Sequence, residues 1–218
     1  MAKTVDEGFR EFYGTLLPTR EESQAAKSHG ASIQACLKKN FGTTQFFPTG
    51  SFGNGTSIRG YSDVDYFACI PTENLKPNSF TTLQEVQKAI SARFPKRKIS
   101  LREPAVVVHF GDGISRPAEI VPAKLMRRKA EDKPIYEIAN GSGNGGWQLS
   151  SPDVHNKYVR EVNSEFDGKV KQLVSLLKAW KYYCDAQIKS FYLEIFVANW
   201  GFPTVGTESW NRKIALLG

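Results

Sequence analysis

The amino-acid sequence predicts an α+β fold in two lobes. Segments with apolar residues at helical spacing occupy both ends of the chain, and short β-branched or aromatic runs that predict strands lie between them. A connection with four glycines in seven residues follows at 140–146. We therefore expect a core of mixed sheet and flanking helices over 1–146 and a helical lobe over 147–218.

The composition is that of a globular protein. Apolar residues make up 40% of the 218 residues, and no stretch approaches the length of a transmembrane helix. The first residues lack the apolar segment of a signal peptide, and the three cysteines form neither a zinc pattern nor a disulfide framework. A reducing compartment suits such cysteines, so the expected location is cytoplasmic.

The chain is basic, with a formal net charge of +7. Its basic residues cluster at 96–98 together with Arg102, and again at 127–129. Such clusters suit polyanions, whether nucleoside triphosphates or nucleic acid, but they are equally typical of solvated loops. No RNA-binding aromatic motif, helix-turn-helix pattern or zinc finger accompanies them, so charge alone does not select a partner.

Two helices are predicted before the first strand. Apolar residues at helical spacing predict an amphipathic helix over 5–16, and Pro18 ends it. Thr19 and Glu22 then form the pattern of a capping box, in which each side chain satisfies a backbone N–H of the other residue. We expect this second helix to continue to about Asn40.

The central part of the chain predicts strands and one helix. β-branched and aromatic runs bounded by turn residues predict the strands, and apolar residues at helical spacing predict the helix. In order, we expect a strand at 45–47, a strand at 64–70, a helix at 81–93, a strand at 105–110, a hairpin turn at 111–113 and a returning strand at 118–123.

The helical lobe is expected to begin at Ser151-Pro152, because a cap residue followed by proline favours a helix start. Gly168 is expected to bend or break this helix. A further helix follows, with Trp180 on its inward face, and the apolar run at 191–200 predicts another.

Residues 50–65 carry the strongest indication of function. Asp63 and Asp65 lie two residues apart at the start of a predicted strand, so both project from the same face. Adjacent carboxylates repel each other unless a cation lies between them, and the hard ions Mg²⁺ and Mn²⁺ favour carboxylate oxygen. The preceding Gly50-Ser51 turn offers backbone N–H groups and a hydroxyl to a phosphate chain. An Asp-x-Asp pair or a glycine-rich turn alone is common, but the two together indicate phosphoryl or nucleotidyl transfer.

The longer pattern around these residues resembles a family signature. The residues that match the signature of the DNA polymerase β-like nucleotidyltransferases are Gly50-Ser51, Gly55-Thr56, Ile58, Gly60 and Ser62-Asp63-Val64-Asp65. The resemblance is greatest to the bacterial relatives of cyclic GMP-AMP synthase and 2′-5′-oligoadenylate synthetase, the CD-NTases. It extends from the predicted helix at Thr19 to about Tyr192.

The resemblance implies a polymerase β-like nucleotidyltransferase core with a helical C-terminal lobe, which is shortened here relative to the family. It implies an enzyme that joins nucleoside triphosphates, ATP or GTP or both, into a cyclic di- or trinucleotide with release of pyrophosphate. It also implies two Mg²⁺ or Mn²⁺ ions, a role in antiphage signalling and a regulatory protein partner.

Two-metal transfer uses ions about 3.5–4 Å apart, and the second ion needs a carboxylate besides Asp63 and Asp65. Glu119 is the candidate, because its setting Ala-Glu-Ile-Val-Pro-Ala resembles the family segment in which an aspartate precedes Ile-Val-Pro-Ala. The glutamate departs from that pattern by one methylene group. Asp112, in the Gly-Asp-Gly turn, is the rival candidate, and a purely structural role for Glu119 stays open.

Lys178 is the candidate for a contact to the triphosphate from the helical side. It shares a helix face with Lys181, and we expect this face to lie opposite the packed residues. The segment Leu-Leu-Lys-Ala-Trp at 176–180 resembles the family's Leu-Leu-Lys-x-Trp helix, in which the lysine reaches the triphosphate. Lys181 is a second candidate on spacing alone, and both lysines are also consistent with an ordinary solvated surface.

The segment 188–194 resembles a family motif in which a serine contacts phosphate and the next aromatic residue stacks on a base. Ser190 and Phe191 occupy those places, with Tyr192 as the alternative to Phe191. A core position for Phe191 is an equal alternative, since its neighbours are apolar. The three histidines show no ligand spacing, and we expect structural roles for them.

Two other functions are consistent with the sequence. One is the transfer of a nucleotide to RNA or protein, and the other is a catalytically inactive nucleotide-binding module. The adjacent Asp63 and Asp65 argue against the inactive module, because a site without chemistry has no need to hold two like charges together.

Overall fold

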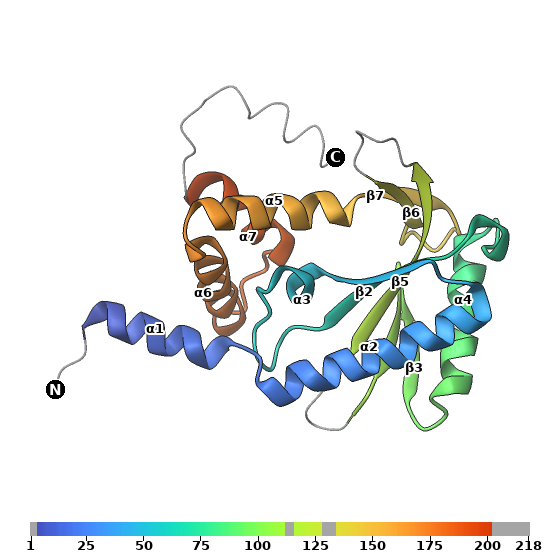
Figure 1. Cartoon of the computed structure of the whole chain (residues 1–218), viewed down its shortest axis with the longest axis horizontal. Helices are drawn as coiled ribbons and strands as arrows, with labels where there is room; N and C mark the ends of the chain where they lie inside the picture. The colour runs from blue at the N-terminus through green and yellow to red at the C-terminus, as the bar shows by residue number, and fades with distance from the viewer. Residues whose placement is uncertain (1–3, 112–115, 128–133, 202–218) are drawn as a thin grey trace.

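The computed structural model describes residues 4–111, 116–127 and 134–201. A mixed sheet with helices forms the larger part, and a lobe of helices lies beside it (Figure 1). The predicted α+β fold is confirmed. Among the described residues, no helix is both long and apolar enough to cross a membrane.

The helices and strands follow the predicted order. The helices are α1 Val5–Leu16, α2 Arg20–Phe41, α3 Gly50–Asn54, α4 Ser79–Arg93, α5 Pro152–Glu165, α6 Lys169–Tyr183 and α7 Ser190–Phe196. The strands are β1 Gln45–Thr49, β2 Val64–Cys69, β3 Lys98–Arg102, β4 Ala105–His109, β5 Ala118–Arg127, β6 Ile135–Ala139 and β7 Trp147–Ser150. A π-helical turn, Val197–Gly201, continues α7. The strands β3, β6 and β7 and the short helix α3 were not predicted.

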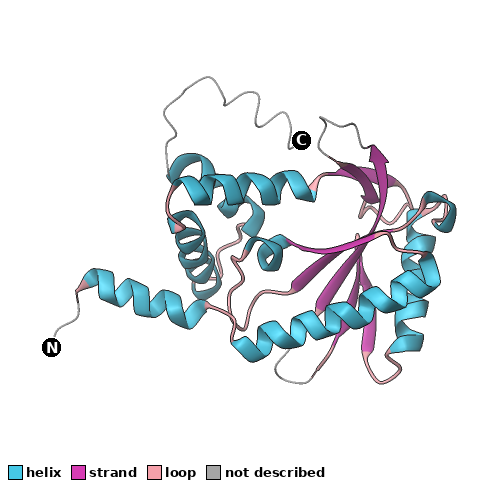
Figure 2. Cartoon of the chain, viewed as in Figure 1, coloured by secondary structure: helices cyan, strands magenta, loops and turns pink. Residues whose placement is uncertain are grey.

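The sheet is organised around β5, which pairs with three other strands (Figure 2). It lies parallel to β2, and its other side pairs antiparallel with β4 over its first residues and with β6 over its last. β1 pairs with β2, β3 with β4 and β7 with β6, all antiparallel. The parallel pair β2–β5 therefore lies inside the sheet, covered on both edges by other strands.

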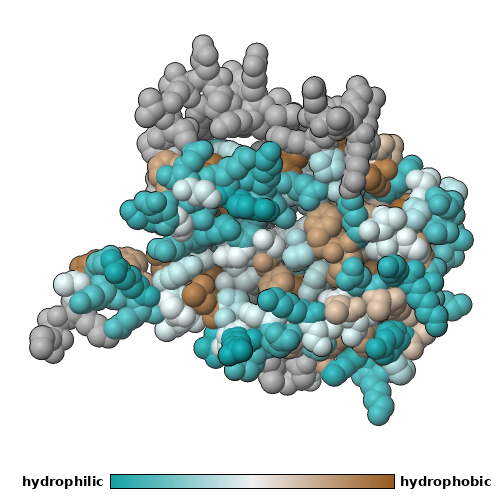
Figure 3. Space-filling model, in the orientation of Figure 1, coloured by the Kyte–Doolittle hydropathy of each residue, from teal (hydrophilic) through white to brown (hydrophobic). Residues whose placement is uncertain are grey.

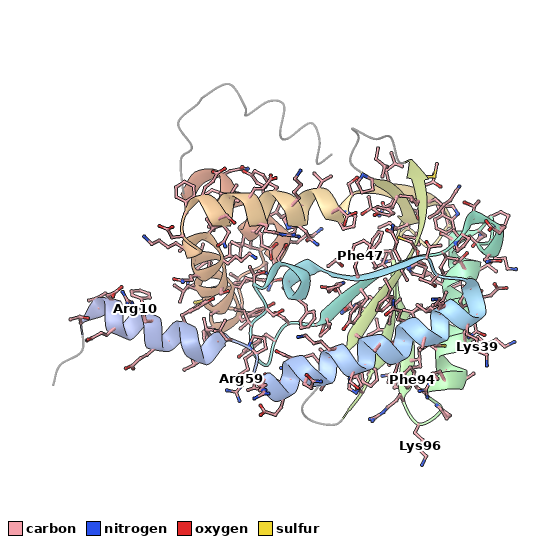
Figure 4. All side chains as sticks on the ribbon, viewed as in Figure 1. Arg10, Lys39, Phe47, Arg59, Phe94 and Lys96 are labelled. Atoms are coloured by element: carbon pink, nitrogen blue, oxygen red, sulfur yellow. The ribbon has the colours of Figure 1, made fainter. Side chains whose placement is uncertain are left out.

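Side-chain alternation along β2 assigns its residues to two faces. Val64, Tyr66 and Ala68 belong to the main apolar core, in which α2 and α4 pack on the sheet. Phe67 packs in a second cluster on the opposite face with residues of β5 and β6. Phe47 of β1, labelled in Figure 4, joins this second cluster. Asp65 shares the face of Phe67, which is the face turned toward the helical lobe.

The helical lobe has an apolar cluster of its own, to which α5, α6 and the turn after α7 contribute. Gly168, with φ +80°, separates α5 from α6 and confirms the predicted break. Tyr136 of β6 donates a 2.6 Å hydrogen bond to Asp153 of α5 and so joins this lobe to the sheet. The expected inward position of Trp180 is wrong, because its side chain is 49% exposed.

The predicted helix α1 is present, but it projects from the rest of the molecule (Figure 1). Among its residues only Leu16 is buried, whereas Val5 and Phe9 are exposed, and Figure 3 shows apolar residues along this helix. The backbone N–H of Arg59 donates to the carbonyl of Leu16, 2.8 Å away. Arg59 lies where α1 meets α2 (Figure 4).

Both N-terminal helices begin with a complete capping box, and this gives a matched pair of variants. Thr19→Ala should lower the free energy of unfolding by about 1 kcal/mol, because the cap of α2 orders a helix that packs in the main core. Thr4→Ala removes the same cap from α1, which buries little. Chemical denaturation measures both variants. Equal effects of the two substitutions would contradict this prediction.

Candidate active site

Asp65 lies at the centre of the candidate site, in register with residues of both neighbouring strands. Its partner on β1 is Thr49, and its partner on the parallel strand β5 is Glu119. Register partners on adjacent strands point to the same face of a sheet, and Asp63 lies two residues earlier on that face. The fold therefore brings together the three carboxylates that the sequence singled out. The rival Asp112 lies outside the described residues.

Gly50 lies directly against Asp65, at the point where β1 passes into α3. Its φ of +54° is a left-handed conformation, and a Cβ at this position would lie 2.1 Å from Asp65 Oδ2. Only glycine adopts this left-handed conformation without strain and also leaves room for the Asp65 carboxylate. Ser51 follows, and its hydroxyl lies 3.2 Å from that of Ser57. The predicted turn is therefore the first part of a five-residue helix that starts beside the carboxylates.

A guanidinium group lies between two of the three carboxylates. Arg102, at the end of β3, contacts Asp63 Oδ2 at 3.1 Å and also contacts Glu119. Arg102 is 62% exposed, whereas Glu119 is mostly buried. The repulsion expected within the carboxylate cluster is thus offset here by a cation of the chain itself. The sequence placed Arg102 in a basic cluster but did not predict these contacts, because they depend on the packing of β3 beyond β4.

The three carboxylates suit a hard divalent cation, since all their donor atoms are oxygen. The position of Arg102 between Asp63 and Glu119 shows that this place accepts positive charge. In the described part of the chain, however, no three side chains of the His, Cys, Asp or Glu type are already arranged as ligands of one ion. Arg102 occupies the place between Asp63 and Glu119, so an ion bound between these two carboxylates would displace it.

The electrostatics of Asp65 reflect this crowding. Burial and the negative charge of Asp63 raise the pKa of Asp65 to about 7, although Arg102 and Lys178 oppose the shift. The carboxyl group thus binds a proton near neutral pH when no other cation neutralises it.

The structure places Lys178 differently from the prediction. Its side chain is 1% exposed, so the expectation that it lies on the face opposite the packed residues is wrong. The ammonium group contacts Glu194 of α7 and donates a 2.8 Å hydrogen bond to Thr56 Oγ1. The predicted contact between Lys178 and a triphosphate stays a prediction.

Glu194 is a second residue that the sequence did not identify as important. Its buried carboxylate accepts hydrogen bonds from Asn54 and Thr56 and lies 2.7 Å from His155 Nε2. Burial alone would raise the pKa of Glu194, but the contacts of His155 and Lys178 outweigh it and lower the pKa to about 2. The residue is ionised at neutral pH. The structural role expected for His155 is consistent with this contact.

The residues proposed for base and phosphate contacts lie at the start of α7. Ser190 accepts a 3.2 Å hydrogen bond from Lys181, so these two candidates are neighbours. Phe191 is 44% exposed and packs beside the rings of His155 and Tyr192. Its exposure excludes a core position. Tyr192 is exposed as well, so the structure leaves both aromatic residues available for stacking.

Comparison with known proteins agrees with this geometry. Residues 3–163 match the family described as the Second Messenger Oligonucleotide or Dinucleotide Synthetase domain, abbreviated SMODS. The chain belongs to the SMODS family. The resemblance to the bacterial CD-NTases, which the sequence motifs indicated, is thereby confirmed.

Two curated relatives support the SMODS assignment. A "probable cyclic nucleotide synthase" of Bacillus cereus strain VD146 is 26% identical over 159 residues, which cover 68% of this chain and 47% of the relative. The CBASS oligonucleotide cyclase CdnC of Escherichia coli strain KTE188 is 26% identical over 168 residues, which cover 69% of this chain and 48% of the relative. The chain thus spans about half the length of the curated relatives it matches.

Solved structures support the fold. CdnE of Elizabethkingia meningoseptica, a cyclic dinucleotide synthase solved with GTP and Apcpp, superposes with a TM-score of 0.72 at 20% identity, over 90% of this chain and 76% of that one. Escherichia coli CdnC solved with ATP gives a TM-score of 0.68 at 18% identity, over 87% and 63% of the two chains. At these identities the likeness shows the fold.

The raised pKa of Asp65 predicts a pH-dependent stability difference. The folded protein binds this proton more tightly than the unfolded chain does, so the contribution of Asp65 to stability falls as the pH rises from about 4 to about 7. Asp65→Asn removes this loss. We expect the metal-free variant to be more stable than wild type at pH 8, by roughly 2 kcal/mol, since one pKa unit corresponds to about 1.4 kcal/mol and burial penalties relax in part.

Urea denaturation with a chelator present, at pH 8 and pH 5, measures this difference. The advantage of Asp65→Asn should shrink at pH 5. The control is Glu161→Gln, which removes an exposed carboxylate paired with Lys157 on α5. A difference between Asp65→Asn and wild type that does not change with pH would contradict the prediction.

Proposed function

We propose that this protein is a nucleotidyltransferase that joins nucleoside triphosphates into a cyclic di- or trinucleotide and releases pyrophosphate. The observation that carries the proposal is the carboxylate cluster formed by Asp65 and Glu119 on two parallel strands and by Asp63 just before the first of them, with Gly50 in contact with Asp65. Membership of a family described by second-messenger synthesis supports it.

Two divalent ions, Mg²⁺ or Mn²⁺, are proposed as cofactors. Asp63 and Asp65 would hold the ion on the triphosphate, and Glu119 would contribute to a second ion. Such ions supply charge neutralisation and lower the pKa of an acceptor hydroxyl. The chain's own task is to hold the three carboxylates on rigid strands and to release Arg102 from Asp63 and Glu119.

The triphosphate is proposed to lie along the start of α3. Gly50 leaves its backbone open there, and Ser51 offers a hydroxyl that another serine already contacts. On the helical side, Ser190 would contact phosphate, with Lys181 next to it, and Phe191 would stack on a base. Ser190 and Phe191 both come from α7 of the helical lobe.

ATP and GTP are the proposed substrates, because the related CdnC and CdnE structures contain ATP, GTP or the analogue Apcpp. The name of CdnC as a CBASS cyclase supports a proposed role in antiphage signalling in the cytoplasm. A CdnC structure with a HORMA protein supports a proposed regulatory protein partner. Transfer to an RNA or protein acceptor is the alternative that the experiment below separates from cyclisation.

Incubation with four labelled nucleoside triphosphates and Mg²⁺ or Mn²⁺, followed by mass analysis, tests the proposal. We expect pyrophosphate and a cyclic oligonucleotide in the absence of any macromolecular acceptor. Asp63→Ala should abolish the product and leave the fold intact, because the residue lies at the mouth of the site and is partly exposed. Product only when RNA or protein is added would favour the alternative, and normal turnover by Asp63→Ala would refute the two-metal assignment.

Glu119 allows a finer test, because the family segment it resembles carries aspartate. Glu119→Gln should lower turnover by about a hundredfold, as expected for the loss of one group that stabilises the transition state, while triphosphate still binds through the ion on Asp63 and Asp65. Glu119→Asp should keep part of the activity, since it retains the carboxylate. Steady-state kinetics and calorimetric triphosphate binding measure both variants. Unchanged turnover in Glu119→Gln would show that Glu119 is structural.

A further inference from the structure

A pocket lies between the start of α2 and the loop that leads from α3 to β2. Arg59, labelled in Figure 4, marks its position near the junction of α1 and α2. The pocket has a volume of about 420 Å³, including the solvent space at its mouth, which is within the range that binds small organic molecules. The proposed function makes no use of this pocket.

The pocket lies on the opposite side of β2 from the carboxylate cluster. Val64 lines the pocket and packs in the main core. Asp65, the next residue, points to the other face, because side chains alternate along a strand. Asp63, Asp65 and Glu119 are all described residues, and none of them lines the pocket. A ligand bound here would therefore leave the carboxylates free for metal and triphosphate.

The walls of the pocket are largely apolar. Buried or partly buried apolar side chains come from four separate segments of the chain, and they are Pro18, Ala26, Phe52, Ile58 and Val64. Two of the serines in the lining already have partners, since Ser62 Oγ accepts a 2.8 Å hydrogen bond from the N–H of Ile58 and Ser57 contacts Ser51. Such walls suit the flat apolar body of a small ligand, because its surface leaves water on binding.

The charged residues of the lining differ in whether they have a partner. Glu22 accepts a 2.7 Å hydrogen bond from the N–H of Thr19 and lies 3.8 Å from Arg59 Nε. Arg116 lies over Gly60, where a Cβ would be 3.2 Å from its Nη2 atom. Within 4–111, 116–127 and 134–201, no carboxylate forms an ion pair with Arg116. The pocket therefore carries one guanidinium group without a counterion, which favours an anionic ligand.

The pocket borders the turn that leads into Asp63. Besides the hydrogen bond from Ile58 to the Ser62 hydroxyl, the N–H of Ser62 donates to the carbonyl of Ile58 at 3.0 Å. At the start of this loop, Ser57 lies 3.2 Å from Ser51 of the candidate phosphate site. A ligand that rests on Ile58 and Ser62 thus contacts the segment that connects Ser51 with Asp63.

We propose that this pocket binds a small organic anion with a flat apolar body. The anionic group pairs with Arg116, and the body rests on Phe52, Ile58 and Val64. The bound ligand holds the loop 57–62 in place. The site is additional to the proposed function, because it lies behind the strand that carries Asp65 and needs neither metal nor triphosphate.

Two fluorescent probes test the ligand chemistry. Anilinonaphthalene sulfonate combines a flat apolar body with one negative charge, and phenylnaphthylamine has the same body without the charge. We expect wild type to bind the sulfonate in a saturable way and the neutral probe more weakly, because only the sulfonate pairs with Arg116. Fluorescence titration of the whole chain without nucleotide measures both affinities. Equal affinity for the two probes, or no saturable binding of the sulfonate, would overturn the proposal.

Three variants separate the charge from the cavity. Arg116→Gln should weaken sulfonate binding about fivefold, as expected for one exposed ion pair, and leave the neutral probe unchanged. Ser23→Phe places a ring in the pocket from α2 and should weaken the binding of both probes. Lys27→Gln is the matched control, because it removes an exposed cation of α2 that does not line the pocket. Equal losses in Arg116→Gln and Lys27→Gln would show a general effect of charge and refute the site.

Hydrogen–deuterium exchange locates the bound sulfonate, and it also covers the case that Ser23→Phe does not fold. Saturation with the probe should slow exchange over 57–62, where the amides of Ile58, Tyr61 and Ser62 donate hydrogen bonds within the turn. Exchange in β6 should stay unchanged. Protection of α1 alone, whose apolar residues are exposed, would place the probe there and contradict the proposal. Failure of the protein to bind triphosphate would refute the proposed function but would not affect this result.

Discussion

The parallel pairing of β2 with β5 is the constraint on which the site depends. It places Asp65 beside Glu119 at the spacing of adjacent strands, about 4.8 Å, in a partly buried environment. Two like charges at about 5 Å repel each other by roughly 3 kcal/mol at an effective dielectric constant of about 20. A fold that keeps three carboxylates here must offset this repulsion with protons or cations, and the molecule uses both.

Arg102 and the proton on Asp65 are the two ways in which the repulsion is relieved. The guanidinium contacts Asp63 and Glu119. The pKa of Asp65 rises to about 7, so at neutral pH the Asp65 carboxyl group is protonated in a fraction of the molecules. A divalent ion would replace both forms of relief at once. On the proposed function, the apparent affinity for metal would therefore include the cost of displacing Arg102 and a proton.

Local rules of sequence predicted the parts of the fold that depend on neighbours along the chain. Thr19 and Glu22 form the predicted capping box, Gly168 separates two helices, and the two-residue spacing put Asp63 and Asp65 on one face. The strand β3 escaped prediction because it is an edge strand with exposed charged ends, so its pattern lacks the apolar run of a buried strand.

The parts of the site that escaped prediction depend on contacts between distant segments. Lys178 was placed opposite the packed residues because its spacing puts it on one helix face with Lys181. Its partner Glu194, however, lies on the next helix, and its other partner, Thr56, lies 122 residues away. Arg102 reaches the carboxylates from the strand β3, two strands away from β5. No periodic pattern in the sequence indicates either of these contacts, because each joins segments that only the folded chain brings together.

Two cations that act to lower the pKa of Asp65 differ in how readily they can move. Arg102 is 62% exposed, so its guanidinium can return to water when another cation takes its place beside Asp63 and the mostly buried Glu119. Lys178 is enclosed, and its departure would strand the buried charge of Glu194. On the proposed function, Arg102 is therefore the exchangeable counterion that gives way to metal, while Lys178 pairs with the buried Glu194. A catalytic site needs both properties, because charge must be replaceable where the substrate binds and immovable where the site is shaped.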